Sequence, residues 1–146
     1  MGAHPWYYSV PYVDDVAGAL SALREREFRA GRYYPAETFP SFPVDAHHAP
    51  GCRHASIEAA RQAAGANGTR SIVDIVRVGE RPDFGVASSL SDDELEELFG
   101  TTTPSAADIM DCDDLFDQIE RGQGVYVTAY EKRSPAQIIF LGYSYD

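Results

Sequence analysis

The end of the chain carries the pattern that most restricts the fold. Two segments rich in β-branched and aromatic residues, 124–130 (GVYVTAY) and 137–145 (QIIFLGYSY), flank the short polar segment EKRSPA. Two such runs joined by a short turn are typical of a β-hairpin. We therefore expect the chain to end in an antiparallel hairpin.

The start of the chain predicts a strand followed by a helix. Residues 6–13 (WYYSVPYV) are mostly aromatic and β-branched, and Pro11 places this strand at a sheet edge or at a strand end. Asp14 is suited to cap the helix that follows, and Gly31 is suited to end it.

The middle of the chain adds three helices and one strand. An Ala-rich helix is expected at about 56–64, and the run SIVDIVRV at 71–78 is expected to form a strand that is buried largely on both faces. Ser91 and Glu94 form a capping box at the start of a third helix. The apolar spacing predicts a fourth helix over 104–121.

Together these elements predict a single α+β domain over residues 1–146. The length is usual for one domain, and neither a Gly/Ser linker nor an internal repeat divides the chain. We expect an antiparallel sheet that includes the C-terminal hairpin, with about four helices packed mainly on one face. Residues 32–55 contain four prolines and are expected to form a long loop, which is uncommon in a compact domain unless the loop is functional.

The formal net charge of −11 comes from one quarter of the chain. Between Arg81 and Arg121 there are twelve carboxylates and neither lysine nor arginine. Such polarised charge favours a basic partner and disfavours nucleic acid and anionic membranes. The three acids at 92–94 are explained by the first turn of a helix. The later acids are either an ordinary solvated face or a partner-binding surface, whose candidate residues are Glu96, Glu97, Asp113, Asp114, Asp117 and Glu120.

Glu27 does not fit the apolar pattern of the first helix. If the apolar stripe is continued by one turn, it ends on this carboxylate. Either the helix end leaves the core and Glu27 reaches water, or Glu27 is buried and holds an arginine such as Arg32. In the second case Glu27 would form the base of a pocket under the 32–55 loop. Arg32, Tyr33 and Tyr34 could then bind an anionic or aromatic small molecule. His47 and His48 of the same loop are further candidate ligand-binding residues.

The same loop contains a group of histidines and a cysteine: His47, His48, Cys52 and His54. Their spacing lacks the paired ligands of a structural zinc site, so no metal is predicted. Cys52 is a candidate nucleophile, with His54 or a distant histidine as its base, and Glu27 is a third candidate catalytic residue. The familiar catalytic and nucleotide-binding motifs are absent, and no cofactor is expected.

The leading functional hypothesis is a small acidic protein-binding module of the inhibitor, antitoxin or immunity type, which engages a basic protein through its acidic helical face. The alternative is a small enzyme or ligand-binding protein with its site under the 32–55 loop. A third hypothesis is a subunit that forms homo-oligomers through the tyrosine-rich strand edges at Tyr7, Tyr8, Tyr143 and Tyr145. The chain lacks a run of about 20 apolar residues and a signal-peptide pattern, so we expect a cytoplasmic protein with reduced cysteines.

Overall fold

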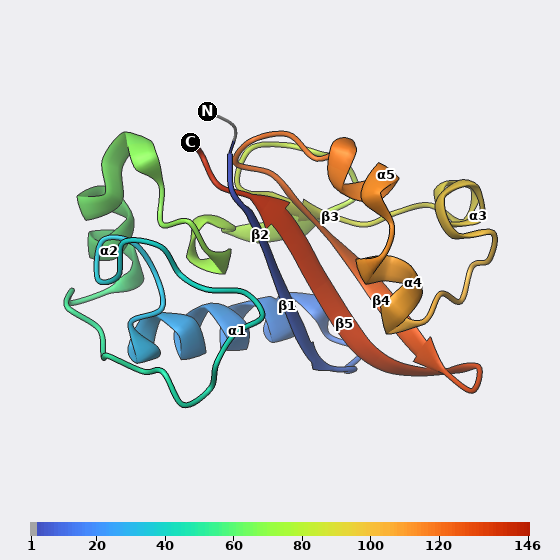
Figure 1. The fold of residues 1–146 in the computed structure, drawn as a ribbon, viewed down its shortest axis with the longest axis horizontal. Helices are drawn as coiled ribbons and strands as arrows, with labels where there is room; N and C mark the ends of the chain where they lie inside the picture. The colour runs from blue at the N-terminus through green and yellow to red at the C-terminus, as the bar shows by residue number, and fades with distance from the viewer. Residues whose placement is uncertain (1–2) are drawn as a thin grey trace.

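The computed structural model describes residues 3–146 and has an α+β fold (Figure 1). Within these residues, five strands form one sheet in the order β1-β5-β4-β3-β2, accompanied by five α-helices. The strands are β1 (Pro5–Pro11), β2 (Arg77–Gly79), β3 (Val86–Ser88), β4 (Gly124–Glu131) and β5 (Ser134–Tyr143). The helices are α1 (Val16–Ala30), α2 (Ile57–Ala64), α3 (Asp92–Phe99), α4 (Ala106–Met110) and α5 (Asp113–Asp117). No helix in the described part of the chain is long and apolar enough to cross a membrane.

The predicted C-terminal hairpin is confirmed. Strands β4 and β5 pair antiparallel, with Glu131 opposite Ser134, so Lys132 and Arg133 alone form the turn. Both turn residues have positive φ, 51° and 68°, as a type I′ turn requires. Strand β1 pairs antiparallel with the other side of β5 and is an edge strand, as Pro11 indicated.

The sheet is mixed, so the prediction of an antiparallel sheet is wrong. Strand β2 runs parallel to β3, and β3 runs parallel to β4. The segment 71–78, predicted as one strand, instead forms a 3₁₀ turn at Ile72–Asp74 and then enters β2. Strand β3 was not predicted, because three residues are too few to show an alternating pattern.

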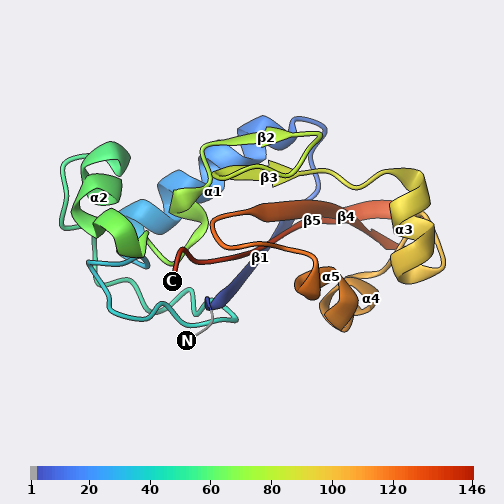
Figure 2. The ribbon, with the colours of Figure 1, turned by 90° about the horizontal axis from the view of Figure 1, so that it is seen from above.

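The helices cover both faces of the sheet, rather than mainly one face as predicted (Figure 2). Helix α1 contributes Leu23 to a core cluster that contains Ile138 of β5. Helix α5 contributes Leu115 to a second cluster that contains Ile139. Successive residues of a strand point to opposite faces, so the unbroken apolar run of β5 needs cover on both sides.

The helix predicted over 104–121 is divided into α4 and α5, which gives five α-helices in residues 3–146 instead of the four expected. Ser105 caps α4 through a capping box with Asp108, and α5 begins only after Cys112. Aspartate favours helix N-termini over helix interiors, so the sequence DCDD at 111–114 suits the start of a new helix better than the middle of an old one.

Residues 31–56 connect α1 to α2 through turns and bends, with neither helix nor strand. The loop passes beside β1 (Figure 1), where the ring of Phe42 lies 5.7 Å from the Tyr7 ring and 5.2 Å from the Tyr8 ring. It then returns to the end of α1, since the Gly51 N–H donates to the Ala30 carbonyl at 2.8 Å. The loop is therefore anchored both on the open edge of the sheet and on the helix.

Candidate ligand-binding site

Glu27 is fully buried near the C-terminal end of α1, with an exposed fraction of 0%. It lies on the same buried side of the helix as Leu20 and Leu23. The periodicity of the sequence therefore places a carboxylate in the protein interior, and the hypothesis that Glu27 reaches water is wrong.

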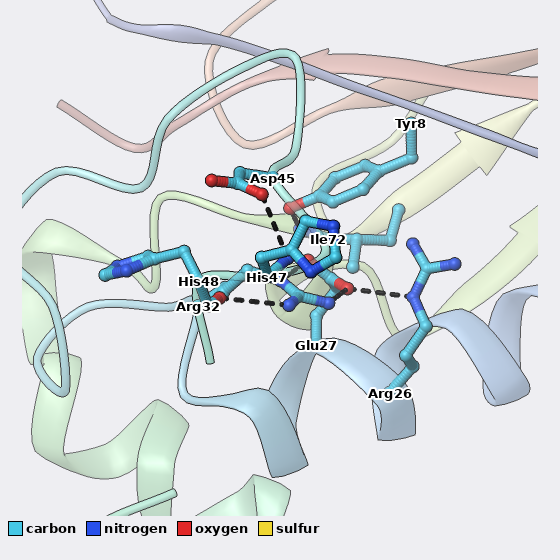
Figure 3. A network of polar contacts seen from close by, with 8 residues as sticks. All are labelled: Tyr8, Arg26, Glu27, Arg32, Asp45, His47, His48 and Ile72. Carbon is cyan, nitrogen blue, oxygen red and sulfur yellow. Dashed lines mark hydrogen bonds and ion pairs between the residues drawn. The ribbon is translucent and has the colours of Figure 1, made fainter. Parts of the chain in front are cut away.

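Two arginines surround the Glu27 carboxylate (Figure 3). Arg32 donates from Nε to Oε1 at 2.9 Å and from Nη2 to Oε2 at 2.5 Å. Arg26 donates from Nε to Oε2 at 2.9 Å. A two-pronged pair of this kind fixes the orientation of the guanidinium as well as its position. Hydrogen bonding to Glu27 also raises the pKa of Arg32, so this guanidinium remains charged.

The end of α1 explains how Arg32 reaches Glu27. Gly31 adopts a left-handed conformation with φ of 78°, and its N–H donates to the Phe28 carbonyl. The N–H of Arg32 donates to the Glu27 carbonyl at 3.1 Å. These two bonds define a Schellman motif, which usually brings two apolar side chains together at the positions that Arg32 and Glu27 occupy. In this protein the ion pair between Glu27 and Arg32 replaces that apolar contact.

The proline-rich loop, residues 31–56, contacts the ion pair of Glu27 and Arg32. Nη1 of Arg32 donates to the backbone carbonyl of His48 at 3.1 Å. The His48 ring in turn contacts the carboxylate of Glu37, which belongs to the same loop. Thus Arg32 connects the buried carboxylate of α1 directly to the loop backbone.

A cavity of about 330 Å³ lies between β1, the two arginines and this loop. Its volume is within the usual range for a small-molecule site. Tyr8 is buried at its base, and burial raises the pKa of its hydroxyl, which stays neutral. The charged residues that line the cavity are Arg26 and Arg32, and the buried Glu27 balances one of these two guanidinium groups. The lining residues are Tyr7, Tyr8, Ser9, Arg26, Arg32, Pro43, Val44 and Ala46.

The remaining candidate residues of the loop do not line this cavity. His54 lies with Nδ1 2.7 Å from the hydroxyl of Tyr33, whose ring is buried against Phe28. Tyr34 instead lies beneath the guanidinium of Arg70. Cys52 is exposed, as are His47 and His48. Within residues 3–146, no group of three His, Cys, Asp or Glu side chains is placed to hold a metal ion.

Arg32 is therefore the one predicted ligand-binding residue that lines the cavity, and Arg26, Tyr8 and Ser9 were missed. The sequence could have indicated Arg26, because it is adjacent to Glu27, the carboxylate that lies on the apolar stripe of the first helix. Tyr8 and Ser9 had none, because only the tertiary fold brings β1 to the end of α1.

The acidic surface lies at the other end of the molecule, where α3, α4 and α5 gather (Figures 1 and 2). Helices α3 and α5 lie next to each other, since the thiol of Cys112, just before α5, lies 3.8 Å from the backbone carbonyl of Leu98 in α3. Asp113 and Asp114 occupy the first turn of α5, and the N-terminus of a helix favours negative charge. Their positions therefore need no partner to explain them. All six candidate partner-binding residues are exposed: Glu96, Glu97, Asp113, Asp114, Asp117 and Glu120.

The tyrosines proposed as an oligomer contact are largely engaged within the chain. Tyr8 is buried, and Tyr7 packs against Phe42. Tyr143 makes an edge contact with Phe116, and Tyr145 packs on Phe84 with ring centroids 4.5 Å apart.

No protein-family model matches this chain, and the comparisons with curated proteins and with solved structures give no match.

Proposed function

We propose that this protein binds a small anionic molecule in the cavity under the 31–56 loop, with Arg26 as the direct contact. The observation that carries the proposal is the fully buried Glu27, which holds one guanidinium beneath the loop and a second at the cavity wall. A buried ion pair is on average a poor source of stability compared with apolar packing. A binding role gives a reason for placing these charges in the interior.

Arg26 has the free donors that an anion needs. Its Nε is bound to Glu27, and its terminal nitrogens point away from that carboxylate (Figure 3). A guanidinium held in this way presents a planar fork that suits a carboxylate or a phosphate. Arg32 uses Nε and both terminal nitrogens on Glu27 and His48, so it contributes charge and supports the loop.

The test is an NMR titration of the protein with butanoate and, separately, with inorganic phosphate. We expect saturable shifts at Ser9, Arg26 and Val44, and loss of these shifts in Arg26→Gln. Arg29→Gln is the matched control, because Arg29 is on the same helix with a side chain that is 75% exposed and outside the cavity. The proposal is wrong if neither anion produces saturable shifts, or if Arg29→Gln weakens binding as much as Arg26→Gln.

A second candidate function is the acidic binding module, favoured by the exposure of all six carboxylates, five of them on the adjoining helices α3 and α5 and the sixth, Glu120, just after α5. Attraction of a basic protein should be strong at low salt and weak at high salt. The test is a pull-down from the native organism at both salt concentrations. Neutralising Asp113, Asp114, Asp117 and Glu120 together should abolish capture, whereas neutralising the exposed acids Asp14, Glu58, Glu80 and Glu131 should not. Equal effects of the two sets would exclude this function.

A further inference from the structure

A second and larger cavity, which is open to solvent, lies where the end of β1 meets the first half of α1. Its volume is about 540 Å³. Its wall is formed mostly by apolar side chains, including Val10, Pro11, Val13, Ala19, Ala22 and Leu23.

Arg26 belongs to the walls of both cavities. On α1, Ala19, Ala22, Leu23 and Arg26 follow the spacing that places residues on one side of a helix. The apolar wall therefore leads along α1 to the guanidinium. From Ala19 to Arg26 this wall is roughly 10 Å long, given a rise of about 1.5 Å per residue.

We propose that this second cavity takes the hydrocarbon tail of a medium-chain monocarboxylate, a fatty acid of roughly eight to ten carbons, whose carboxylate is bound by Arg26. The inference rests on the anion site proposed above and names its ligand class. An apolar wall that ends at one fixed positive charge matches a molecule with one anionic head and an apolar tail.

Asp15 adds a selection against ligands that are charged at both ends. It lines the same cavity, at the N-terminal end of α1 and away from Arg26. A second carboxylate at the end of the tail would lie near this acid and would be repelled. Monocarboxylates should therefore bind more tightly than dicarboxylates of the same length.

The experiment is calorimetric titration of the full chain with butanoate, octanoate, decanoate, decanol and decanedioate, each below its micelle concentration. From butanoate to octanoate, the affinity should rise by about two- to fourfold per added methylene. Decanol and decanedioate should each bind at least about tenfold more weakly than decanoate, because one lacks the charge for Arg26 and the other meets Asp15.

Variants of α1 locate the tail. Ala22→Phe fills the apolar cavity and should weaken decanoate binding at least about tenfold. Ala17→Phe is the matched control, since Ala17 is an exposed alanine of the same helix outside both cavities, and it should leave the affinity for decanoate unchanged.

The outcomes separate this inference from the proposed function. Binding of butanoate that depends on Arg26, without a gain from longer chains, would overturn the inference and leave the anion site in place. Binding of decanol as tight as that of decanoate would also overturn it. If no carboxylate binds at any length, the inference fails, and the anion site fails with it only if inorganic phosphate also does not bind.

Discussion

Glu27 and Arg32 form a buried, two-pronged ion pair across the C-terminal cap of α1, with donor-acceptor distances of 2.9 and 2.5 Å. The same two residues are joined through their backbones by one hydrogen bond of the Schellman motif. The geometry of the helix end thus positions the charges, and the charges hold the loop that follows. Removing the Glu27 carboxylate would leave the Arg32 guanidinium without its counter-charge in the interior.

Glu27→Gln should therefore destabilise the protein strongly. The amide keeps the shape of the side chain but leaves the Arg32 guanidinium without its counter-charge. We expect a loss of about 3–5 kcal/mol in the free energy of unfolding, measured by urea denaturation. Glu25→Gln is the control, because Glu25 pairs with Arg29 in the solvent and should cost no more than about 0.5 kcal/mol. Similar losses in both variants would show that the buried ion pair contributes no more to the free energy of unfolding than the exposed pair does.

Gly31→Ala should be much more harmful than Gly100→Ala. Both glycines end a helix with positive φ, 78° at Gly31 and 72° at Gly100. An added Cβ at Gly31 would overlap the backbone of Gly51, whereas the space around Gly100 is open. We expect a loss of about 1 kcal/mol for Gly100→Ala, from the left-handed conformation alone, and at least about 3 kcal/mol for Gly31→Ala. Equal losses in urea denaturation would contradict the close approach of the loop to α1.

Arg70 should hold the first part of the proline-rich loop. Its guanidinium lies 4.5 Å from the ring centre of Tyr34 and 4.6 Å from that of Phe39, and Nη1 donates to the Thr38 carbonyl at 2.6 Å. It also forms an ion pair with Asp146 at 3.0 Å. Arg70→Ala should lower amide-exchange protection across residues 34–39 by about tenfold or more.

Arg77→Ala is the control for Arg70, since Arg77 is exposed on β2 and should leave exchange in the loop unchanged. Arg70→Lys should protect the loop less well than arginine, because an ammonium cannot stack on two rings and donate in a fork at once. Unchanged protection in Arg70→Ala would show that other contacts hold the loop.

Local patterns predicted the parts of this fold that depend on neighbours in sequence. The capping box of Ser91 and Glu94, the hairpin turn and the helix end at Gly31 are all formed as expected. The apolar stripe raised burial of Glu27 as one of two alternatives, but only the structure, in which Glu27 is fully buried, decided between them.

Features that depend on distant contacts were not predictable in the same way. Strand β3 is only three residues long and exists because it lies between β2 and β4. The cavity needs Tyr8 and Arg26 to meet, and they belong to elements whose relative placement no local pattern determines. The break at Cys112 was missed because the apolar spacing continues across it, although the aspartates around it favour a new helix start.

Asp74, in the 3₁₀ turn Ile72–Asp74, provides a pH-dependent test of a second buried carboxylate. Its side chain is buried, with an exposed fraction of 2%, and Oδ2 lacks a hydrogen-bond partner in residues 3–146. Burial raises the pKa of this carboxyl, although Thr69 donates to Oδ1 from its backbone N–H at 2.7 Å and from its hydroxyl at 2.9 Å. The folded protein therefore holds the Asp74 proton more tightly than the unfolded chain does.

The sign of the effect follows from linkage. A raised native pKa stabilises the fold at pH values below the unfolded pKa of about 3.9, and this contribution is lost as the pH rises through the native pKa. Asp74→Asn does not titrate and keeps an oxygen for Thr69. The unfolding free energy of the wild type relative to Asp74→Asn should therefore fall as the pH rises from about 4, and should become constant above the native pKa. The measurement is urea denaturation of both proteins between pH 4 and 8 at constant ionic strength, so that the other carboxyls cancel in the difference. A wild type that gains stability over the variant with rising pH would mean that the hydrogen bonds from Thr69, together with the attraction of Arg61, outweigh the burial of the charge.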